Sequence, residues 1–322
     1  MVSGEMASKS ALTRREVLRA GVGFACAPLL PEIKSPSTRF GLIADVHHGL
    51  VSFSERYLEE FVQEAAQRNV DFVVQLGDFC HPNPASRSFL NEWSNFRGPR
   101  YGVLGDHDLD YGSKDEAIRW WGIPDRFYSF DSGNSHFIAL DANNLFDKGR
   151  YVPYEESNFY GDMSRISHVD EEQLDWLVND LEGTSKPSFV FVHQAIDEID
   201  GGGACLNRHR VRAILEEANR RAGRSKVVAC FQGHHHTDQY EKRRGIHYVR
   251  INSATHAWLG DRFDKTADYA EPLFCFVTVG KDEIVIEGRE GTWVESSPSD
   301  RKFPGADRLS PTLSSRRLRF AQ

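Results

Sequence analysis

Seven side chains that can bind a metal ion stand in five short groups along this sequence, each directly after a run of apolar residues. They are Asp45, His47, Asp78, Asp106, His193, His234 and His236. One Asp-x-His group alone is weak evidence in a chain with 13 histidines, because short motifs match by chance. Five groups at the ends of predicted strands indicate one site, because open α/β sheets bind their ligands at the carboxyl edge of the strands.

Electrostatics favours a metal centre over a structural role for these residues. Three carboxylates about 4 Å apart repel each other by roughly 4 kcal/mol per pair at an effective dielectric constant near 20. Divalent cations remove that repulsion, and a mixed set of Asp and His ligands suits Mn, Fe, Zn or Co better than Ca. We therefore disfavour the alternative, in which the residues are core histidines and loop aspartates.

The elements that must position these groups alternate between strand and helix, which is the pattern of an α/β sheet with flanking helices. We predict strands at residues 40–44, 72–76, 101–104, 137–140, 189–192 and 227–231, and helices at residues 55–68, 114–121, 171–181 and 208–222. In the third helix Leu174, Leu177 and Leu181 recur at helical spacing, so we expect them to face the core, with Asp170 as the cap. After Gly233 we predict strands at residues 246–251, 273–279 and 284–286, in a second sheet that packs on the first.

Composition excludes two classes of protein. The chain has 322 residues and a formal net charge of -8, whereas proteins that hold nucleic acid by its phosphates need an excess of Lys and Arg. No run reaches the roughly 18 apolar residues that span a bilayer, so we expect no transmembrane segment. Cys80, Cys205, Cys230 and Cys275 form no C-x-x-C pair, which favours buried or free thiols, although an exported location would permit a disulfide.

Residues 1–36 are predicted to be a twin-arginine type signal segment. The pair Arg14 and Arg15 is followed by the short apolar stretch of residues 20–30, as in substrates of the twin-arginine export machinery. We therefore expect a periplasmic or extracellular protein, without a lipid anchor on Cys26, because the residues before it fit poorly. The alternative is an amphipathic N-terminal helix with two incidental arginines.

The order of the five groups, D-x-H, G-D, G-D-H-D, H and G-H-x-H, resembles that of the calcineurin-like metallophosphoesterase superfamily over residues 39–288. The resemblance implies a four-layer αββα sandwich of two packed mixed β-sheets flanked by helices. We assign residues 37–295 to this metallophosphoesterase domain and expect residues 296–322, which are rich in Ser, Pro and Arg, to be a flexible tail.

The resemblance also implies a role for each site residue. One metal ion would be held by Asp45, His47 and His236, Asp78 would bridge both ions, and the second would be completed by Asp106, His193 and His234. His107 would protonate the leaving oxygen and Asp108 would orient His107. A hydroxide that bridges two cations about 3.5–4 Å apart would attack in line with the leaving group.

Two positions depart from the family pattern. Most members have Asn where this chain has Asp106, so the second ion would face an added negative charge. Most members also have a proline shortly after the position of His193, whereas this chain has Gln194 and Ala195 there. Neither change removes a type of ligand. His81 stands where purple acid phosphatases have a tyrosine ligand, which argues against an iron-tyrosinate centre.

Further segments are similar to the manganese-dependent ADP-ribose/CDP-alcohol diphosphatases, namely residues 172–177, 205–207, 231–234 and 245–249. This similarity favours Mn over Fe or Zn and a small, possibly nucleotide-linked phosphorylated substrate. Trp93, Tyr111, Trp120 and Trp121 are candidates for stacking a base, although core packing is the more general role of such side chains.

Three hypotheses on function follow. The first is a dinuclear metal-dependent hydrolase of a phosphodiester or phosphoanhydride. The second is a phosphomonoesterase that scavenges phosphate. The third is a non-catalytic metal-binding or ligand-binding module in which Asp106 has abolished the reaction.

Overall fold

Two six-stranded mixed sheets organise the computed structural model, which describes residues 37–162, 164–199, 202–259 and 265–321. The first sheet has the order β18 (Arg316–Arg319), β15 (Glu283–Glu287), β14 (Cys275–Val279), β1 (Thr38–Ile43), β2 (Phe72–Gln75), β3 (Arg100–Gly102). The second has the order β10 (Gln239–Arg243), β11 (Ile246–Arg250), β9 (Val227–Gln232), β8 (Ser188–Val192), β5 (Ser135–Ala139), β4 (Tyr128–Ser132). The predicted signal segment, residues 1–36, lies outside the described residues.

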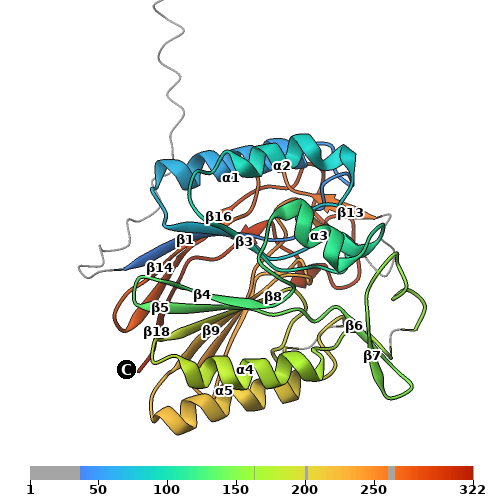
Figure 1. Cartoon of the computed structure of the whole chain (residues 1–322). Helices are drawn as coiled ribbons and strands as arrows, with labels where there is room; N and C mark the ends of the chain where they lie inside the picture. Colours follow the sequence, from blue (N-terminus) through green and yellow to red (C-terminus); the bar gives the residue numbers. More distant parts are fainter. Residues whose placement is uncertain (1–36, 163, 200–201, 260–264, 322) are drawn as a thin grey trace, which may run out of the picture. The chain divides into compact units, whose positions relative to one another are not determined.

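Helices cover the outer face of each sheet, so the layers follow the order helix, sheet, sheet, helix (Figure 1). Helices α1 (Ser54–Gln67) and α2 (Arg87–Ser94) lie over the first sheet, with α3 (Lys114–Trp121) beside them. Helices α4 (Glu171–Gly183) and α5 (Arg208–Ala222) lie over the second. The predicted four-layer αββα sandwich is therefore confirmed.

Two apolar layers hold the sandwich together. Between the sheets, the Phe40 ring of β1 lies 5.4 Å from Phe137 and 5.8 Å from Phe191, both of the second sheet. Because these strands are buried on both faces, their sequences are nearly continuous apolar runs. On the outer face of the second sheet, Leu174 and Leu177 of α4 belong to a cluster that includes strand residues of β8. The predicted core face of α4 is confirmed, and so is its cap, because the Asp170 side chain accepts from Gln173 N.

The strands predicted after Gly233 divide between the two large sheets, so the prediction that they belong together to a second sheet is wrong for β14 and β15. Strands β10 and β11 extend the second sheet, whereas β14 and β15 extend the first, where β14 pairs antiparallel with β1. Pairing with β14 covers an edge of β1 that would otherwise present unpaired backbone groups. An apolar run shows that a strand exists and does not show which strand it joins.

The flexible tail predicted for residues 296–322 is wrong for its last part. Strand β18 pairs with β15, and Leu318 and Phe320 are buried in the main core. Composition concealed this strand because Leu318 is its one apolar residue among three arginines, and Arg317 pairs with Glu283 on the neighbouring strand. An ion pair of this kind lets a charged segment lie along a sheet edge.

Short elements complete the described chain. They are the hairpins β6 (Asn144–Asp147) with β7 (Arg150–Pro153), β12 (His256–Trp258) with β13 (Thr266–Asp268), and β16 (Arg289–Glu290) with β17 (Thr312–Leu313), and the 3-10 turns η2 (Pro84–Ser86), η3 (His107–Leu109) and η4 (Ala306–Arg308). Cys80, Cys205, Cys230 and Cys275 are buried free thiols. Across the described ranges, no helix has the length and apolar character to cross a membrane.

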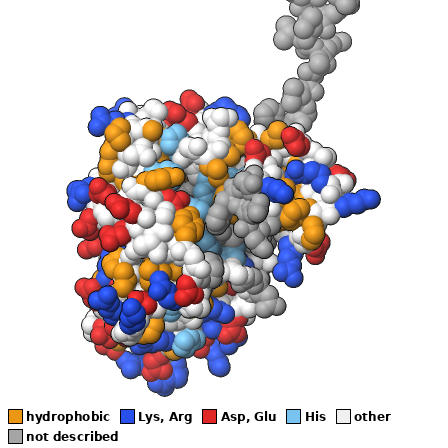
Figure 2. Space-filling model, turned by 90° about the vertical axis from the view of Figure 1, so that its right-hand side faces the viewer, with side chains coloured by type: hydrophobic (Ala, Val, Ile, Leu, Met, Phe, Trp, Pro, Cys, Tyr) orange, Lys and Arg blue, Asp and Glu red, His pale blue; other side chains and the backbone are white. Residues whose placement is uncertain are grey.

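Parallel pairing brings the predicted site residues to one end of the molecule. Strands β1, β2 and β3 run parallel in the first sheet, and β5, β8, β9 and β11 run parallel in the second. The loops after their carboxyl ends carry the acidic residues and histidines singled out in the sequence. Figure 2, which faces the right-hand side of Figure 1, shows histidine side chains gathered near the middle of that surface.

Candidate metal centre

All seven side chains predicted to bind metal meet in one cluster. The ligand atoms of Asp78, Asp106, His193 and His234 lie within 4.8 Å of one another, and so do those of Asp45, His47 and Asp78. His236 belongs to a further group with His47 and His256. Asp78 is common to the first two groups, so it stands between two neighbouring positions that could each hold an ion.

The backbone is strained at five of these seven residues. Asp45, His47, Asp78, His234 and His236 have φ values of 51°, 48°, 50°, 67° and 49°, in the left-handed region. Residues with a Cβ seldom adopt this conformation, which costs on the order of 1–3 kcal/mol each and persists only where the surroundings enforce it. Such concentrated strain is typical of functional sites.

Hydrogen bonds and two glycines enforce this backbone. His47 N donates to Asp78 O at 2.8 Å, and His234 N donates to Asp45 Oδ1 at 3.0 Å. A Cβ on Gly77 would stand 2.5 Å from His193 Nδ1, and one on Gly105 would stand 2.1 Å from Asp78 N. Glycine at these two positions therefore lets the loops after β2 and β3 approach each other closely.

Two histidines are fixed in the tautomer that can bind a metal. His193 Nδ1 donates to Leu76 O at 2.7 Å, and His236 Nδ1 donates to His256 O at 2.8 Å. A carbonyl oxygen can only accept, so Nδ1 of each ring keeps its proton and Nε2 is the nitrogen that can bind a metal ion. His193 Nε2 lies 3.2 Å from Asp78 Oδ2 and 3.2 Å from Asp106 Oδ1, and His236 Nε2 lies 3.4 Å from Asp45 Oδ1.

Charge in the cluster is strongly coupled. Burial opposes a charge on the His193 ring, but the Asp78 and Asp106 carboxylates outweigh burial and raise the pKa of His193 well above 6.5. Burial also opposes ionisation of Asp106, yet His234 and His193 outweigh it and lower the pKa of Asp106 well below 3.8. Burial, with the neighbouring His236, lowers the pKa of His47 well below 6.5. Asp106 is therefore an anion, and His47 is neutral, which is the form that binds metal.

The donor set fits divalent cations. Within the described chain, the ion-pair partners of Asp45, Asp78 and Asp106 are all histidines. Asp45 and Asp78 are buried, and buried carboxylates require a compensating positive charge. Imidazole and carboxylate ligands together suit transition-metal ions, so these residues could hold a pair of them.

His107 is held by Asp110 and not by Asp108, so that part of the sequence prediction is wrong. His107 Nδ1 lies 3.1 Å from Asp110 Oδ2 and 3.1 Å from Tyr160 Oη, and Tyr160 donates to Asp110 Oδ1 at 2.8 Å. The 3-10 turn η3 explains the difference, because side chains three residues apart eclipse each other in this helix. Burial lowers the pKa of His107, but Asp78 and Asp110 outweigh it and raise the pKa to about 10, so the ring carries a proton at neutral pH.

Asp108 instead braces the loops of the cluster. Its two carboxylate oxygens accept from four backbone amides, those of Asp78 (2.9 Å), Phe79 (2.7 Å), Cys80 (3.0 Å) and Gly105 (2.8 Å). The Asp108 side chain is buried. It therefore fixes the loop after β2 against the loop after β3. Asp108 acts on the site by holding these two loops, and with them Asp78, in place.

A cleft of about 300 Å³ opens beside the cluster. Its lining includes His47, Asp78, His107, Asp110 and Trp258 in the interior, and Leu50, His81, Tyr111 and Tyr160 toward the rim. Tyr111 is 73% exposed. The rings of His81 and Tyr111 are perpendicular, with their centroids 4.8 Å apart. The ring of His48 stacks on Phe89, with a centroid distance of 4.3 Å, and its Nδ1 is hydrogen-bonded to Ser54 Oγ. Both histidines line the cleft, and His48 is also held by its stacking on Phe89.

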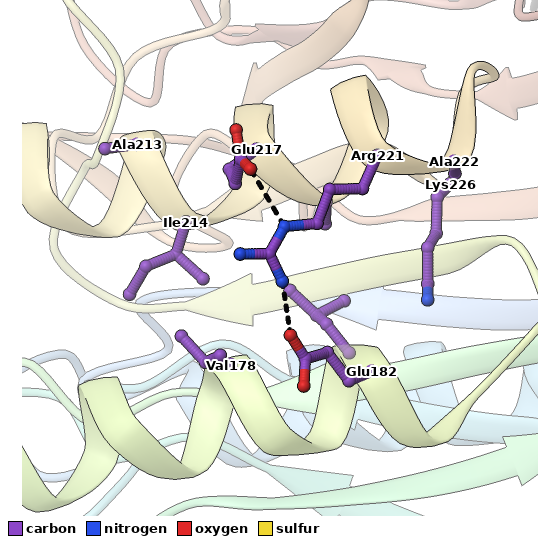
Figure 3. Close-up of a pocket in the computed structure, with 10 residues that line it drawn as sticks. Val178, Glu182, Ala213, Ile214, Glu217, Arg221, Ala222 and Lys226 are labelled. Atoms are coloured by element: carbon purple, nitrogen blue, oxygen red, sulfur yellow. Dashed lines mark hydrogen bonds and ion pairs between the residues drawn. The ribbon is translucent and has the colours of Figure 1, made fainter.

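A larger cavity of about 450 Å³ lies between α4 and α5 (Figure 3), and its lining shares no described residue with that of the cleft. Val178, Leu181, Ile214 and Ala218 give it an aliphatic lining, and Arg221 bridges Glu217 and Glu182 beside it (Figure 3). The carboxylates of Glu182 and Glu217 at this cavity are paired with Arg221, and its described lining contains no histidine or aspartate, so the smaller cleft is the candidate active site.

Comparisons with known proteins agree with this geometry. The profile of the calcineurin-like phosphoesterase family matches residues 38–238. Two manganese-dependent ADP-ribose/CDP-alcohol diphosphatases are similar over 277 residues: one of Arabidopsis thaliana (22% identical, 69% of this chain, 87% of the relative) and one of Oryza sativa subsp. japonica (24% identical, 69% and 84%).

Two solved structures share the fold. A dimetal phosphatase from Danio rerio superposes with a TM-score of 0.61 at 18% identity, over 81% of this chain and 99% of the other. GAP50, the anchor in the inner membrane complex of Plasmodium, superposes with a TM-score of 0.59 at 15% identity, over 89% and 90%. At such identities the likeness extends to the fold alone.

Proposed function

Because this chain belongs to the calcineurin-like phosphoesterase family, we propose that it is a dinuclear metal-dependent phosphohydrolase that cleaves a phosphodiester or a phosphoanhydride. The observation that carries the proposal is the cluster itself, in which buried and half-buried carboxylates and histidines form two groups of possible ligands that share Asp78. One ion would be held by Asp45, His47, Asp78 and His236, and the other by Asp78, Asp106, His193 and His234.

The chain's own residues prepare the reaction around these ions. When bound, divalent cations neutralise phosphate oxygens and make ionised water available near neutral pH. His107 would donate a proton to the leaving oxygen. Asp110 and Tyr160 engage Nδ1 of its ring and would orient the ring for that transfer. The manganese dependence of the similar diphosphatases supports Mn²⁺ as the first ion to test.

Charge along the cleft supports a diester over a monoester. The lining contains the carboxylates of Asp78, Asp108 and Asp110, and the described part of the lining has no Lys or Arg. A monoester dianion would need more positive charge than a diester monoanion, and only the ions and histidines could supply it. The exposed Tyr111 at the rim offers a ring face to a planar group, which supports a nucleoside-linked or aromatic alcohol.

The test compares Asp45→Ala with wild type and with Asp175→Ala, a matched control that replaces an exposed carboxylate on α4. Bound metal is counted, and hydrolysis of bis-p-nitrophenyl phosphate and p-nitrophenyl phosphate is measured with Mn²⁺. We expect two ions per chain and faster diester turnover in wild type and control, and loss of turnover in D45A. A preference for the monoester would instead identify a phosphomonoesterase.

The same assay tests the alternative that the protein binds metal but is not an enzyme, because the ionised Asp106 adds a negative charge to the cluster. If wild type binds two ions and cleaves neither ester, and Asp106→Asn restores turnover, the added carboxylate has abolished the reaction. The protein would then be a metal-binding or ligand-binding module.

We also propose export by the twin-arginine route, supported by the Arg14 and Arg15 pair and the apolar residues 20–30. Fusion of residues 1–36 to a folded reporter protein should carry the reporter out of a bacterial cytoplasm. The R14K/R15K double variant should hold it inside, and equal export of both fusions would contradict the proposal.

A further inference from the structure

We propose that His256 is an additional protein ligand of the ion held by Asp45, His47, Asp78 and His236, and that this makes the two metal positions chemically unequal. The inference rests on the proposed metal-dependent function. It assigns a role to a residue outside the seven singled out in the sequence, and it concerns which ion each position prefers.

His256 reaches the cluster from a strand that ends at the same edge as the others. Strand β11 pairs parallel with β9, and the loop after β11 leads to His256 at the start of β12. The side chain is fully buried, and its ring centroid lies 5.2 Å from that of His47 and 4.8 Å from that of His236. The ligand nitrogens of all three lie within 4.8 Å of one another. Two ligand atoms on opposite sides of one ion, with bonds of about 2.1 Å, are separated by nearly that distance.

The second observation is a ring nitrogen without a hydrogen-bond partner. His256 Nε2 is buried, and no atom of the described residues bonds to it. Buried polar side-chain atoms in native proteins nearly always have a partner. An unsatisfied nitrogen within a ring of metal ligands is therefore evidence for an ion.

The tautomer of His256 leaves that nitrogen with a free lone pair. Nδ1 lies 2.9 Å from Thr255 Oγ1, and this hydroxyl donates to Asp45 O at 3.3 Å. A hydroxyl has one proton, so it accepts from His256 Nδ1–H, and the lone pair of the ring is on Nε2. The His256 carbonyl also accepts from His236 Nδ1 at 2.8 Å. His256 thus orients one ligand through its backbone while its own ring points a lone pair into the same group.

An unpartnered nitrogen alone would not suffice, as His235 illustrates. Both ring nitrogens of His235 are also buried without a partner among the described residues. His235 belongs to none of the three groups of possible ligands in the described chain, so it carries no such inference. His256 combines the free lone pair with the right neighbours.

The consequence is a difference between the two positions. With His256, the first position would have three imidazoles and two carboxylates, whereas the second has two of each. Imidazole ligands suit Zn²⁺, Fe²⁺ and Co²⁺, and carboxylates suit Mn²⁺ and Mg²⁺. We therefore expect the first position to bind a borderline ion such as Zn²⁺ tightly and the second to accept Mn²⁺.

The test measures metal binding directly on the full chain. Wild type, His256→Gln and His247→Gln are dialysed against buffered free Zn²⁺ or Mn²⁺, and bound metal is counted by mass spectrometry. His247 is a matched control, because it is equally buried but its ring bonds Tyr240 and Arg319 O. We expect H256Q to need about tenfold or more free Zn²⁺ to fill its tighter position, since even outer-sphere partners change affinity by about 10- to 100-fold, with a smaller change for Mn²⁺ and none in H247Q.

X-ray absorption of wild type with one equivalent of Zn²⁺ gives a second measurement that needs no variant. Three imidazoles around zinc are expected, and two would overturn the inference. Unchanged Zn²⁺ affinity in H256Q would overturn it as well, while two bound ions in wild type would leave the proposed function standing. A wild-type chain that binds no divalent ion would overturn both.

Discussion

Replacement of Asp110 by Asn should weaken proton donation by His107 while the metal cluster stays intact. Asp110 bonds His107 Nδ1 at 3.1 Å and accepts from Tyr160 at 2.8 Å, and it belongs to none of the groups of possible ligands among the described residues. A hydrogen bond to a charged group contributes about 1.5–3 kcal/mol, which corresponds to roughly 10- to 150-fold in rate. That lies below the roughly 10²- to 10⁴-fold contributed by general acid–base catalysis, so we expect partial loss.

The assay uses the dependence of the loss on the leaving group. Bis-p-nitrophenyl phosphate releases a stable anion and needs little protonation, whereas diphenyl phosphate releases a more basic phenolate. We expect D110N to lose roughly 10- to 150-fold in kcat on diphenyl phosphate and much less on the nitrophenyl ester. Because Asp110 is among the groups that raise the pKa of His107, the alkaline limb of the kcat profile should also move to lower pH.

Asp108→Asn is the matched comparison, because within the described chain the carboxylate of Asp108 accepts from four backbone amides, whereas that of Asp110 bonds the His107 ring. Loss of an acceptor for buried amides should lower stability and metal content, and activity on both diesters should fall together. A leaving-group-dependent loss in D108N with none in D110N would refute the assignment of Asp110 and return that role to Asp108.

Three further outcomes are expected. Gly105→Ala should reduce bound metal and activity, because the new Cβ would stand 2.1 Å from Asp78 N; normal metal content would contradict this. Chelation should lower Tm, since ions that bind only the folded state stabilise it by mass action; an unchanged Tm would argue against resident ions. Burial lowers the pKa of His136, but the hydrogen bonds that its ring donates to the carboxylates of Asp180 and Asp131 outweigh burial and raise the pKa. His136 therefore stabilises the fold below its unfolded pKa of about 6.5, and this contribution is lost as pH rises through the higher folded value. The free energy of unfolding in denaturant should be higher for wild type than for H136Q at acidic pH, and this difference should shrink as the pH becomes alkaline. A difference that does not change with pH would exclude this role of His136.

The sequence predicted a helix accurately where capping residues mark both of its ends. The predicted helix of residues 114–121 has the bounds of α3, because Ser113 and Glu116 form a capping box and Gly122 ends the helix in the left-handed conformation. Helix α2 was missed because it is short and its two buried residues, Phe89 and Trp93, give little periodicity. Trp93 and Trp121 lie in the core, whereas Tyr111 lies at the cleft, and no local signal separates these roles.

The sequence predicted those site residues that directly follow the parallel strands. Residues after β1, β2, β3, β8 and β9 meet because the carboxyl ends of those strands share an edge. The same rule applied to β11 leads to His256, but its partner strand could not be known from an apolar run. The exchange of Asp108 for Asp110 depends on a 3-10 turn of three residues, which sequence spacing alone does not reveal.

The two departures from the family pattern are neighbours in space. Gln194 Nε2 lies 3.2 Å from Asp106 Oδ1 and 2.5 Å from Asn143 Oδ1, so the residue that follows His193 donates to the carboxylate that replaces the usual Asn. His234 Nδ1 also lies 3.0 Å from Asp106 Oδ1. An oxygen ligand is kept at this position whether the residue is Asn or Asp, and the amide of Gln194 partly balances the added charge. If an ion binds between Asp78, Asp106, His193 and His234, the added carboxylate would attract it more strongly without removing a ligand, which favours an active site adapted to a less anionic substrate over an abolished one.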